Sequence, residues 1–106
     1  MIFEQSKDFR KAFKRLLKKY PSIDNDLTAL LYKIEYNPFL GEPLGDNCYK
    51  IRMAISSKKA GKSGGARVIT CVKIVEDTIH LLTMYDKSEM ENISDAYLDE
   101  LRKSIE

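Results

Sequence analysis

The sequence predicts one α+β domain over residues 1–106, with a small, mostly antiparallel sheet, an N-terminal helical hairpin and a C-terminal helix. Before residue 37, apolar residues recur three and four positions apart, which is the period of an amphipathic helix. After residue 47, apolar and polar residues alternate, which is the period of a half-buried strand. A chain of 106 residues is long enough for one core. We therefore expect the order (β)ααβββα, with the helices on one face of the sheet.

The N-terminal half is predicted to hold a short strand and two helices. Met1–Gln5 is partly apolar and can form the strand. Ser6 is a suitable N-cap residue, and the helix that follows it is stopped by Pro21. Ser22 can cap a second helix, which ends at Asn37-Pro38 because the residue before a proline is pushed out of helical geometry. The short connection between the helices predicts an antiparallel hairpin.

The C-terminal half is predicted to hold three strands and a last helix. Residues 37–47 are rich in proline and glycine and are expected to form a loop. The strands span Cys48–Ile55, Ala66–Val75 and Thr78–Tyr85, and the last of these is apolar on both faces, as a central strand is. The final helix follows Ser94, which can cap it. No repeat or linker interrupts this pattern.

The composition argues against several classes of protein. No apolar run approaches the ~20 residues of a membrane-spanning helix, and no secretory leader is present, so we expect a cytoplasmic protein. Cys48 and Cys71 are then expected to be reduced and to serve packing. His80 is the one histidine and completes no metal-ligand set, so we expect no metal and no cofactor. Gly61-Lys62-Ser63 does not fit a P-loop, because a strand rather than a helix follows it.

The charge of the chain is unevenly distributed. The net charge is only +2, yet residues 47–75 carry seven cationic side chains and no acidic one. These side chains are Lys50, Arg52, Lys58, Lys59, Lys62, Arg67 and Lys73. Strand alternation places four of them, Lys50, Arg52, Arg67 and Lys73, on the face of the sheet that the apolar residues leave open. A concentrated positive field on a folded surface most often meets phosphate.

Several segments together resemble the RelE/HigB branch of bacterial toxin–antitoxin toxins. The first is Leu44–Arg52, and the second is Ser57–Ile69, which includes the Gly-Gly-x-Arg-Val-Ile strand. The third is Leu81–Glu89, with Tyr-x-Lys at the end of its strand, and Lys-Lys-Tyr-Pro-Ser at residues 18–22 resembles HigB-type toxins. The resemblance implies a ribosome-dependent endoribonuclease that cleaves mRNA without a metal, and a cognate antitoxin of helix-turn-helix type as its partner. The ribosome and mRNA are the other partners it implies.

The resemblance also implies the site residues. Arg67 matches the middle-strand arginine of the family, Lys87 stands where many members have arginine, and Tyr85 is the nearby aromatic residue. The expected catalytic set is Arg67, Lys87, Lys58, Lys59, Lys62 and Tyr85, and the expected RNA-binding set is Lys50, Arg52 and Lys73. We expect the Arg67 guanidinium to face solvent, with its lysine companions on the same side of the molecule.

Each of these residue types suits RNA cleavage by attack of a 2′-hydroxyl on the adjacent phosphate. Arg67 can clamp two phosphate oxygens. A lysine crowded by other cations has a lowered pKa and can act as the general base; Lys58, Lys59 and Lys62 are the candidates. Tyr85 can stack on a nucleobase. Two alternatives stay open: a ParE-like toxin that inhibits DNA gyrase, and a non-catalytic module that binds RNA or the antitoxin.

Overall fold

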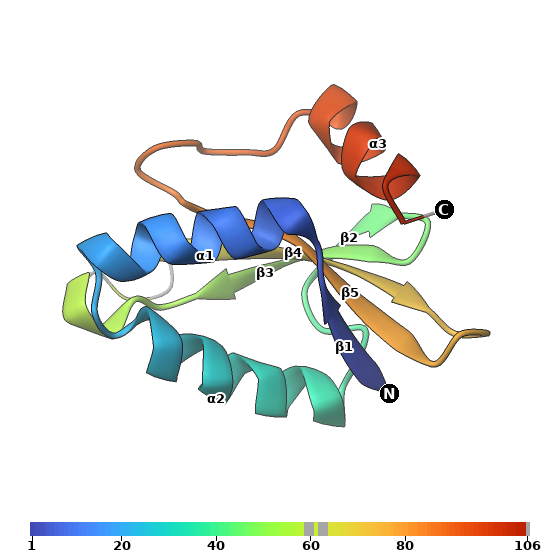
Figure 1. Ribbon diagram of the computed structural model, residues 1–106, viewed down its shortest axis with the longest axis horizontal. Helices are drawn as coiled ribbons and strands as arrows, with labels where there is room; N and C mark the ends of the chain where they lie inside the picture. The colour runs from blue at the N-terminus through green and yellow to red at the C-terminus, as the bar shows by residue number, and fades with distance from the viewer. Residues whose placement is uncertain (59–60, 62–63, 106) are drawn as a thin grey trace.

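The computed structural model describes residues 1–58, 61 and 64–105, and it confirms the predicted α+β fold (Figure 1). The elements are β1 (Ile2–Gln5), α1 (Lys7–Lys19), α2 (Ile23–Tyr36), β2 (Glu42–Gly45), β3 (Cys48–Met53), the 3₁₀ turn η1 (Ser56–Lys58), β4 (Ala66–Lys73), β5 (Thr78–Asp86) and α3 (Asp95–Lys103). Over the described ranges, no helix is both long and apolar enough to cross a membrane.

The sheet has five strands in the order β1-β5-β4-β3-β2. β1 runs parallel to β5, and the other neighbouring strands run antiparallel. β5 therefore lies inside the sheet between β1 and β4, which agrees with its apolar character on both faces. Nearly all of its residues are buried.

The predicted loop at residues 37–47 contains the short strand β2. Gly41 has a φ of 110°, and a Cβ atom there would lie 2.6 Å from the Lys50 carbonyl oxygen, so only glycine lets the chain approach β3 so closely. Asp46 and Asn47 both have positive φ, at 51° and 59°, which is the geometry of a tight hairpin turn between β2 and β3. The proline and glycine content indicated a loop, and this backbone geometry was not apparent from it.

Two of the three predicted caps are confirmed. The Ser6 hydroxyl accepts a hydrogen bond from the Phe9 N–H at 3.0 Å and donates one to the Leu82 carbonyl at 2.6 Å, which ties the start of α1 to β5. The Ser94 hydroxyl accepts from the Tyr97 N–H at 3.1 Å. Ser22 does not cap α2, because its backbone is helical and its hydroxyl donates to Asp26 instead.

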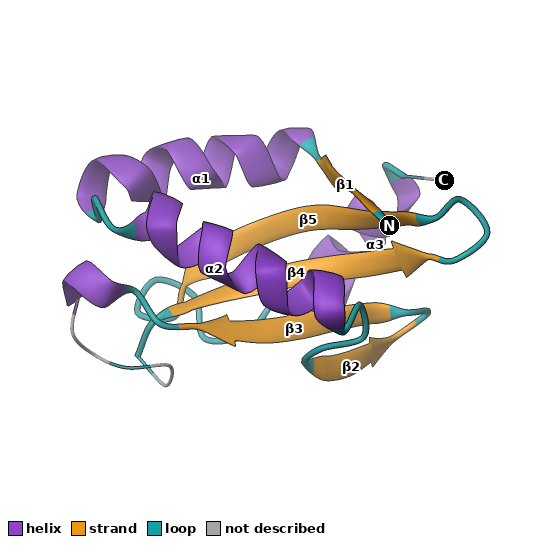
Figure 2. Cartoon of the chain, turned by 90° about the horizontal axis from the view of Figure 1, so that it is seen from below, coloured by secondary structure: helices purple, strands orange, loops and turns teal. Residues whose placement is uncertain are grey.

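Helices cover both faces of the sheet, which corrects the expectation that they share one. α1 and α2 bury one apolar cluster against the alternate sheet residues that include Ile51 and Val68. α3 buries a second cluster, with Leu98 and Leu101 against Ile69, on the opposite face. Figure 2 shows α2 lying across β3 and β4, with α3 on the far side of the sheet. We call these the hairpin face and the α3 face.

A β-bulge in β5 sets which side chains reach each face. The register between β4 and β5 skips one residue, because Ile69 pairs with Thr83 and the next residue, Thr70, pairs with Leu81. Leu82 is the extra residue of the bulge. As a result Met84 packs in the cluster of the hairpin face, whereas Leu82 and Tyr85 pack in that of the α3 face.

Candidate functional site

Arg52, Arg67 and Tyr85 form a row across three neighbouring strands on the α3 face. In the sheet register, Arg52 pairs with Arg67, and Arg67 pairs with Tyr85. Like charges directly opposite each other on a sheet destabilise the fold. The pairing of Arg52 with Arg67 is therefore unfavourable for stability at this position.

The two arginines differ sharply in exposure. Arg52 is exposed, whereas the Arg67 residue is only 3% exposed. One guanidinium nitrogen of Arg67 donates to the Ala66 carbonyl oxygen at 3.0 Å. Burial, followed by the charge of Arg52, lowers the pKa of Arg67. The expectation that Arg67 faces solvent was wrong. The strand register places its side chain on the α3 face, and that face is covered rather than open.

Tyr85 is buried in the same place. Its residue is 3% exposed, and it belongs to the apolar cluster that α3 completes. Burial raises the pKa of the Tyr85 phenol. In this arrangement the ring packs against protein, so stacking on a nucleobase requires a change at this face.

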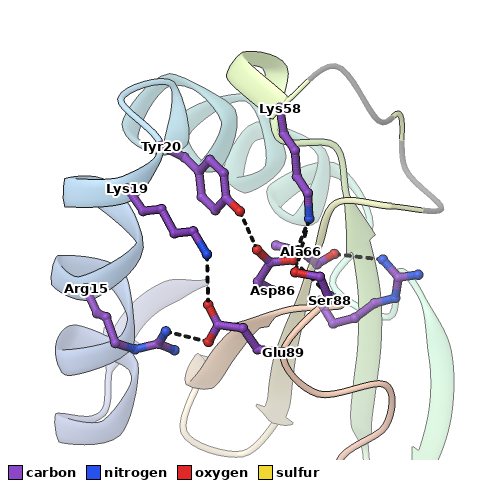
Figure 3. A network of polar contacts seen from close by, with 9 residues as sticks. Arg15, Lys19, Tyr20, Lys58, Ala66, Asp86, Ser88 and Glu89 are labelled. Carbon is purple, nitrogen blue, oxygen red and sulfur yellow. Dashed lines mark hydrogen bonds and ion pairs between the residues drawn. The ribbon is translucent and has the colours of Figure 1, made fainter.

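Residues 87–93, which we call the 87–93 segment, cross the α3 face between β5 and α3. Glu89 holds it to α1 through Arg15 at 2.6 Å and Lys19 at 3.7 Å (Figure 3). Asn92 accepts a hydrogen bond from the Lys50 ammonium, on β3, at 3.1 Å. Two apolar residues of the segment, Met90 and Ile93, pack on the cluster that contains Tyr85. The segment thus spans the α3 face from α1 to β3.

A second polar cluster lies on the hairpin face, centred on the fully buried carboxylate of Asp86. Asp86 accepts hydrogen bonds from the Tyr20 hydroxyl at 2.7 Å, the Lys58 ammonium at 2.7 Å and the Ser88 N–H at 3.0 Å. Figure 3 shows Tyr20 and Lys58 pointing at Asp86 from different elements. Burial alone would raise the pKa of Asp86, but these hydrogen bonds outweigh it and hold the pKa well below its usual range.

The contacts of Lys58 with the Asp86 cluster contradict the expectation that its pKa is lowered. The hydrogen bond with Asp86 raises the pKa of Lys58, and the ammonium also lies 5.7 Å from the Tyr20 ring centroid. Crowding by cations was expected to lower this pKa, but the nearest charged partner is a carboxylate. The cluster around Asp86 was not predicted from the sequence. A single carboxylate that ends an otherwise apolar strand was the one signal that could have indicated it.

The other predicted site residues are dispersed. Lys50 lies on the α3 face and pairs with Glu42 at 3.0 Å as well as with Asn92. The Lys87 N–H donates to the Gly65 carbonyl, which places Lys87 just beyond the β5 end of the row. Lys73 is at the opposite end of β4, where it pairs with Thr78. Lys59 and Lys62 lie outside the described residues. Within those residues, no three metal-ligating side chains gather.

Comparisons with known proteins agree on one family. The family model described as the RelE toxin of the RelE/RelB toxin–antitoxin system matches residues 7–105. A solved structure of the E. coli toxin RelE, a double arginine-to-alanine mutant in the free state, superposes with a TM-score of 0.66 at 16% identity. That match covers 99% of this chain and 97% of the RelE chain, and at this identity it shows a shared fold. No curated protein sequence matches this chain.

Proposed function

Because this chain belongs to the RelE toxin family of RelE/RelB toxin–antitoxin systems, we propose that it is an endoribonuclease that cleaves mRNA on the ribosome. The observation that carries the proposal is the group of cations on the α3 face. Arg52 faces Arg67 there, and Lys50 lies on β3 two residues before Arg52. The reaction is attack of a 2′-hydroxyl on the adjacent phosphate, which leaves a 2′,3′-cyclic phosphate and a 5′-hydroxyl. Its antitoxin holds it inactive, and a helix-turn-helix protein is the form we expect for that partner.

The cationic residues have different roles in the proposed reaction, according to their exposure and position. Arg52 is exposed and makes the first contact with the RNA backbone, together with Lys50. Arg67 stabilises the charge that develops on the phosphorane, since a guanidinium can bind two phosphate oxygens in parallel. Lys87, next to the row, adds positive charge. Lys73 is too far along β4 to share this site and contributes at most to long-range attraction of RNA.

Arg67 must be uncovered before it can bind phosphate, and the 87–93 segment is the element that moves. Its polar contacts, at Glu89 and Asn92, pair partly exposed side chains, and exposed ion pairs contribute only about 0.2–1 kcal/mol each. RNA competes for the same cations, because Lys50 holds Asn92 while Arg15 and Lys19 hold Glu89. Binding of the RNA backbone therefore loosens the segment.

Lys58 is not the general base in this proposal. Its bond to Asp86 favours the protonated ammonium, and a base must be neutral to accept a proton. Lys58 instead stabilises the end of the sheet beside the site, through its contacts with Tyr20 and Asp86. Lys59 and Lys62 remain the candidates for the base.

The test uses purified toxin and ribosomes programmed with a defined mRNA. New 5′ ends are mapped by primer extension for the wild type, for Arg52→Ala and Arg67→Ala, and for Lys73→Ala as the matched control on the same face. We expect cleavage within the codon in the A site, a loss of at least tenfold for the two row variants and little change for Lys73→Ala. Intact mRNA with the folded wild type would refute the proposal.

One alternative has an observation in its favour. A buried Arg67 suits a non-catalytic module that binds RNA or the antitoxin through Arg52 and leaves Arg67 as a structural residue. The same experiment separates the two, because a binding module protects mRNA from added nuclease without cutting it. A supercoiling assay with DNA gyrase covers the ParE-like alternative, for which inhibition without mRNA cleavage is the diagnostic result.

A further inference from the structure

The two cysteines of the chain lie directly opposite each other on β3 and β4. The Val72 N–H donates to the Asn47 carbonyl at 2.9 Å, so Asn47 and Val72 form a hydrogen-bonded pair of the antiparallel ladder. Cys48 and Cys71 are the next pair and are therefore not hydrogen-bonded to each other, an arrangement in which the Cα atoms lie about 4.5 Å apart. Disulfides span Cα separations of about 4.4–6.8 Å.

The surroundings of the two sulfur atoms are polar although both residues are buried. The sulfur atoms of Cys48 and Cys71 lie 3.8 Å and 3.7 Å from the same acceptor, the Asp46 carbonyl oxygen. On the other side, the Arg102 Nε of α3 donates to the Cys48 sulfur at 3.4 Å. The two sulfur atoms thus face one another between a carbonyl and a guanidinium.

This environment gives the two thiols different chemistry. A hydrogen bond from the Cys71 thiol lowers the pKa of Cys48 to about 6, and the Arg102 guanidinium acts in the same direction against burial. The pKa of Cys71 is raised, by its hydrogen bond to Cys48 and then by burial. Cys48 is the nucleophile of the pair, and Cys71 keeps its proton. Such an unequal pair is typical of cysteines that react with oxidants.

We propose that Cys48 and Cys71 form a redox-modification site, at which a peroxide drives formation of a reversible disulfide between β3 and β4. The Cys48 thiolate attacks one oxygen of hydrogen peroxide, the O–O bond breaks, and Cys48 sulfenic acid and hydroxide form. The Cys71 sulfur then attacks the Cys48 sulfur, the S–O bond breaks, and the hydroxyl leaves as water with the Cys71 proton. Two thiols give two electrons to the peroxide, which becomes two water molecules.

Access to the pair is controlled by α3. The residues Cys48 and Cys71 are 0% and 2% exposed, and they belong to the cluster that Leu98 and Leu101 of α3 complete. Peroxide reaches them when this nine-residue helix moves away from the sheet. Once the disulfide forms, Arg102 loses the Cys48 thiolate as a partner, since a disulfide sulfur carries no charge, but it keeps its ion pairs with Asp46 and Asp99. Oxidation is therefore expected to join the strands and to remove one of several contacts that hold α3 to the sheet.

The experiment exposes the folded protein to hydrogen peroxide, then denatures it in an alkylating reagent and measures its mass. We expect loss of both alkylatable thiols in a monomer lighter by two hydrogen atoms, with full reversal by dithiothreitol. The Cys71→Ser variant should accumulate a sulfenic acid at Cys48 that dimedone traps, whereas Cys48→Ser should keep a free Cys71 thiol. Circular dichroism checks that both variants are folded.

The experiment distinguishes slow access of peroxide to the buried cysteines from a pair that cannot form a disulfide. The wild type is also equilibrated for many hours with mixtures of oxidised and reduced dithiothreitol, so that burial affects only the rate. Two thiols that stay alkylatable under both treatments, or a disulfide found only between two chains, overturn the proposal. So does equal reactivity of Cys48→Ser and Cys71→Ser toward peroxide. None of these readouts depends on RNA cleavage.

Discussion

Arg52 and Arg67 face each other across β3 and β4, one exposed and the other 97% covered. Both side chains lie on the α3 face, because the antiparallel register of β3 and β4 places the two residues opposite each other. The exposed guanidinium offers charge to a partner at once, whereas the covered one becomes available only after a local rearrangement. The pair therefore combines a surface cation with a hidden one.

Replacing Arg52 with alanine is expected to stabilise the fold slightly while weakening RNA binding. Removing one of two like charges placed opposite each other should raise the free energy of unfolding by about 0.2–1 kcal/mol. Urea denaturation measures this gain, and RNA retention at several salt concentrations measures the loss of affinity. Arg52→Lys, which keeps the repulsion, is the control. An Arg52→Ala variant that is less stable than the wild type would contradict the assignment of the pair.

Replacing Glu89 with glutamine is expected to loosen the 87–93 segment without unfolding the domain. The change removes the charge that holds Arg15 and Lys19, at a cost of about 0.2–1 kcal/mol because these ion pairs are largely exposed. Hydrogen exchange should quicken for the amides of residues 87–93 and stay unchanged for β4. Glu91→Gln, in the same segment, is the control. Equal protection of the segment in Glu89→Gln and the wild type would argue against the tether.

Replacing Asp86 with asparagine is expected to lower the free energy of unfolding by about 2–3 kcal/mol. The carboxylate is fully buried and accepts from Lys58 and Tyr20, and hydrogen bonds to charged groups are among the strongest in a protein. Chemical denaturation gives the value. The double variant Asp86→Asn with Lys58→Met should recover part of the loss, since it no longer leaves an ammonium unpaired. A double variant as unstable as the sum of its parts would exclude coupling.

The same carboxylate predicts loss of stability in acid. The folded-state pKa of Asp86 lies below its ordinary value of 3.8, so the unfolded chain takes up a proton at higher pH than the folded one does. The stabilisation is therefore complete above about pH 5 and is lost as the pH falls through 3.8 and below. Urea midpoints between pH 7 and pH 3 test this. Asp86→Asn should reduce the dependence of the urea midpoint on pH. A profile as steep as that of the wild type would show that other carboxylates cause the loss of stability in acid.

The elements of the fold could be predicted because their signals are local. The stripe of α1, the cap at Ser6 and the alternation along β4 depend on residues only a few positions apart. For the same reason the predicted cap at Ser22 was wrong and β2 was not predicted. The hydroxyl of Ser22 has a competing partner in Asp26, and β2 exists because Gly41 can approach a carbonyl of a strand that follows later in the chain.

The sequence predicted which residues belong to the candidate site but not how the fold covers and separates them. Alternation along each of two strands correctly put Arg52 and Arg67 on the same face, because successive side chains of a strand point to opposite faces of the sheet. It could not show that α3 and the 87–93 segment would cover that face. Nor could it show that Lys58, counted with the other cations, would turn to the hairpin face and bind Asp86. Those outcomes depend on contacts between residues far apart in the chain.

The one-residue irregularity at Leu82 separates two adjacent side chains of opposite chemistry. Beyond it, Tyr85 joins the arginines and Asp86 joins Lys58, each on its own side of the sheet. If β5 kept all its residues but paired with β4 without the bulge, the two side chains would exchange faces, so that an acid lay on the face of the arginines and a phenol on that of the lysine. The extra residue therefore decides which of two neighbouring side chains meets each cluster of charges.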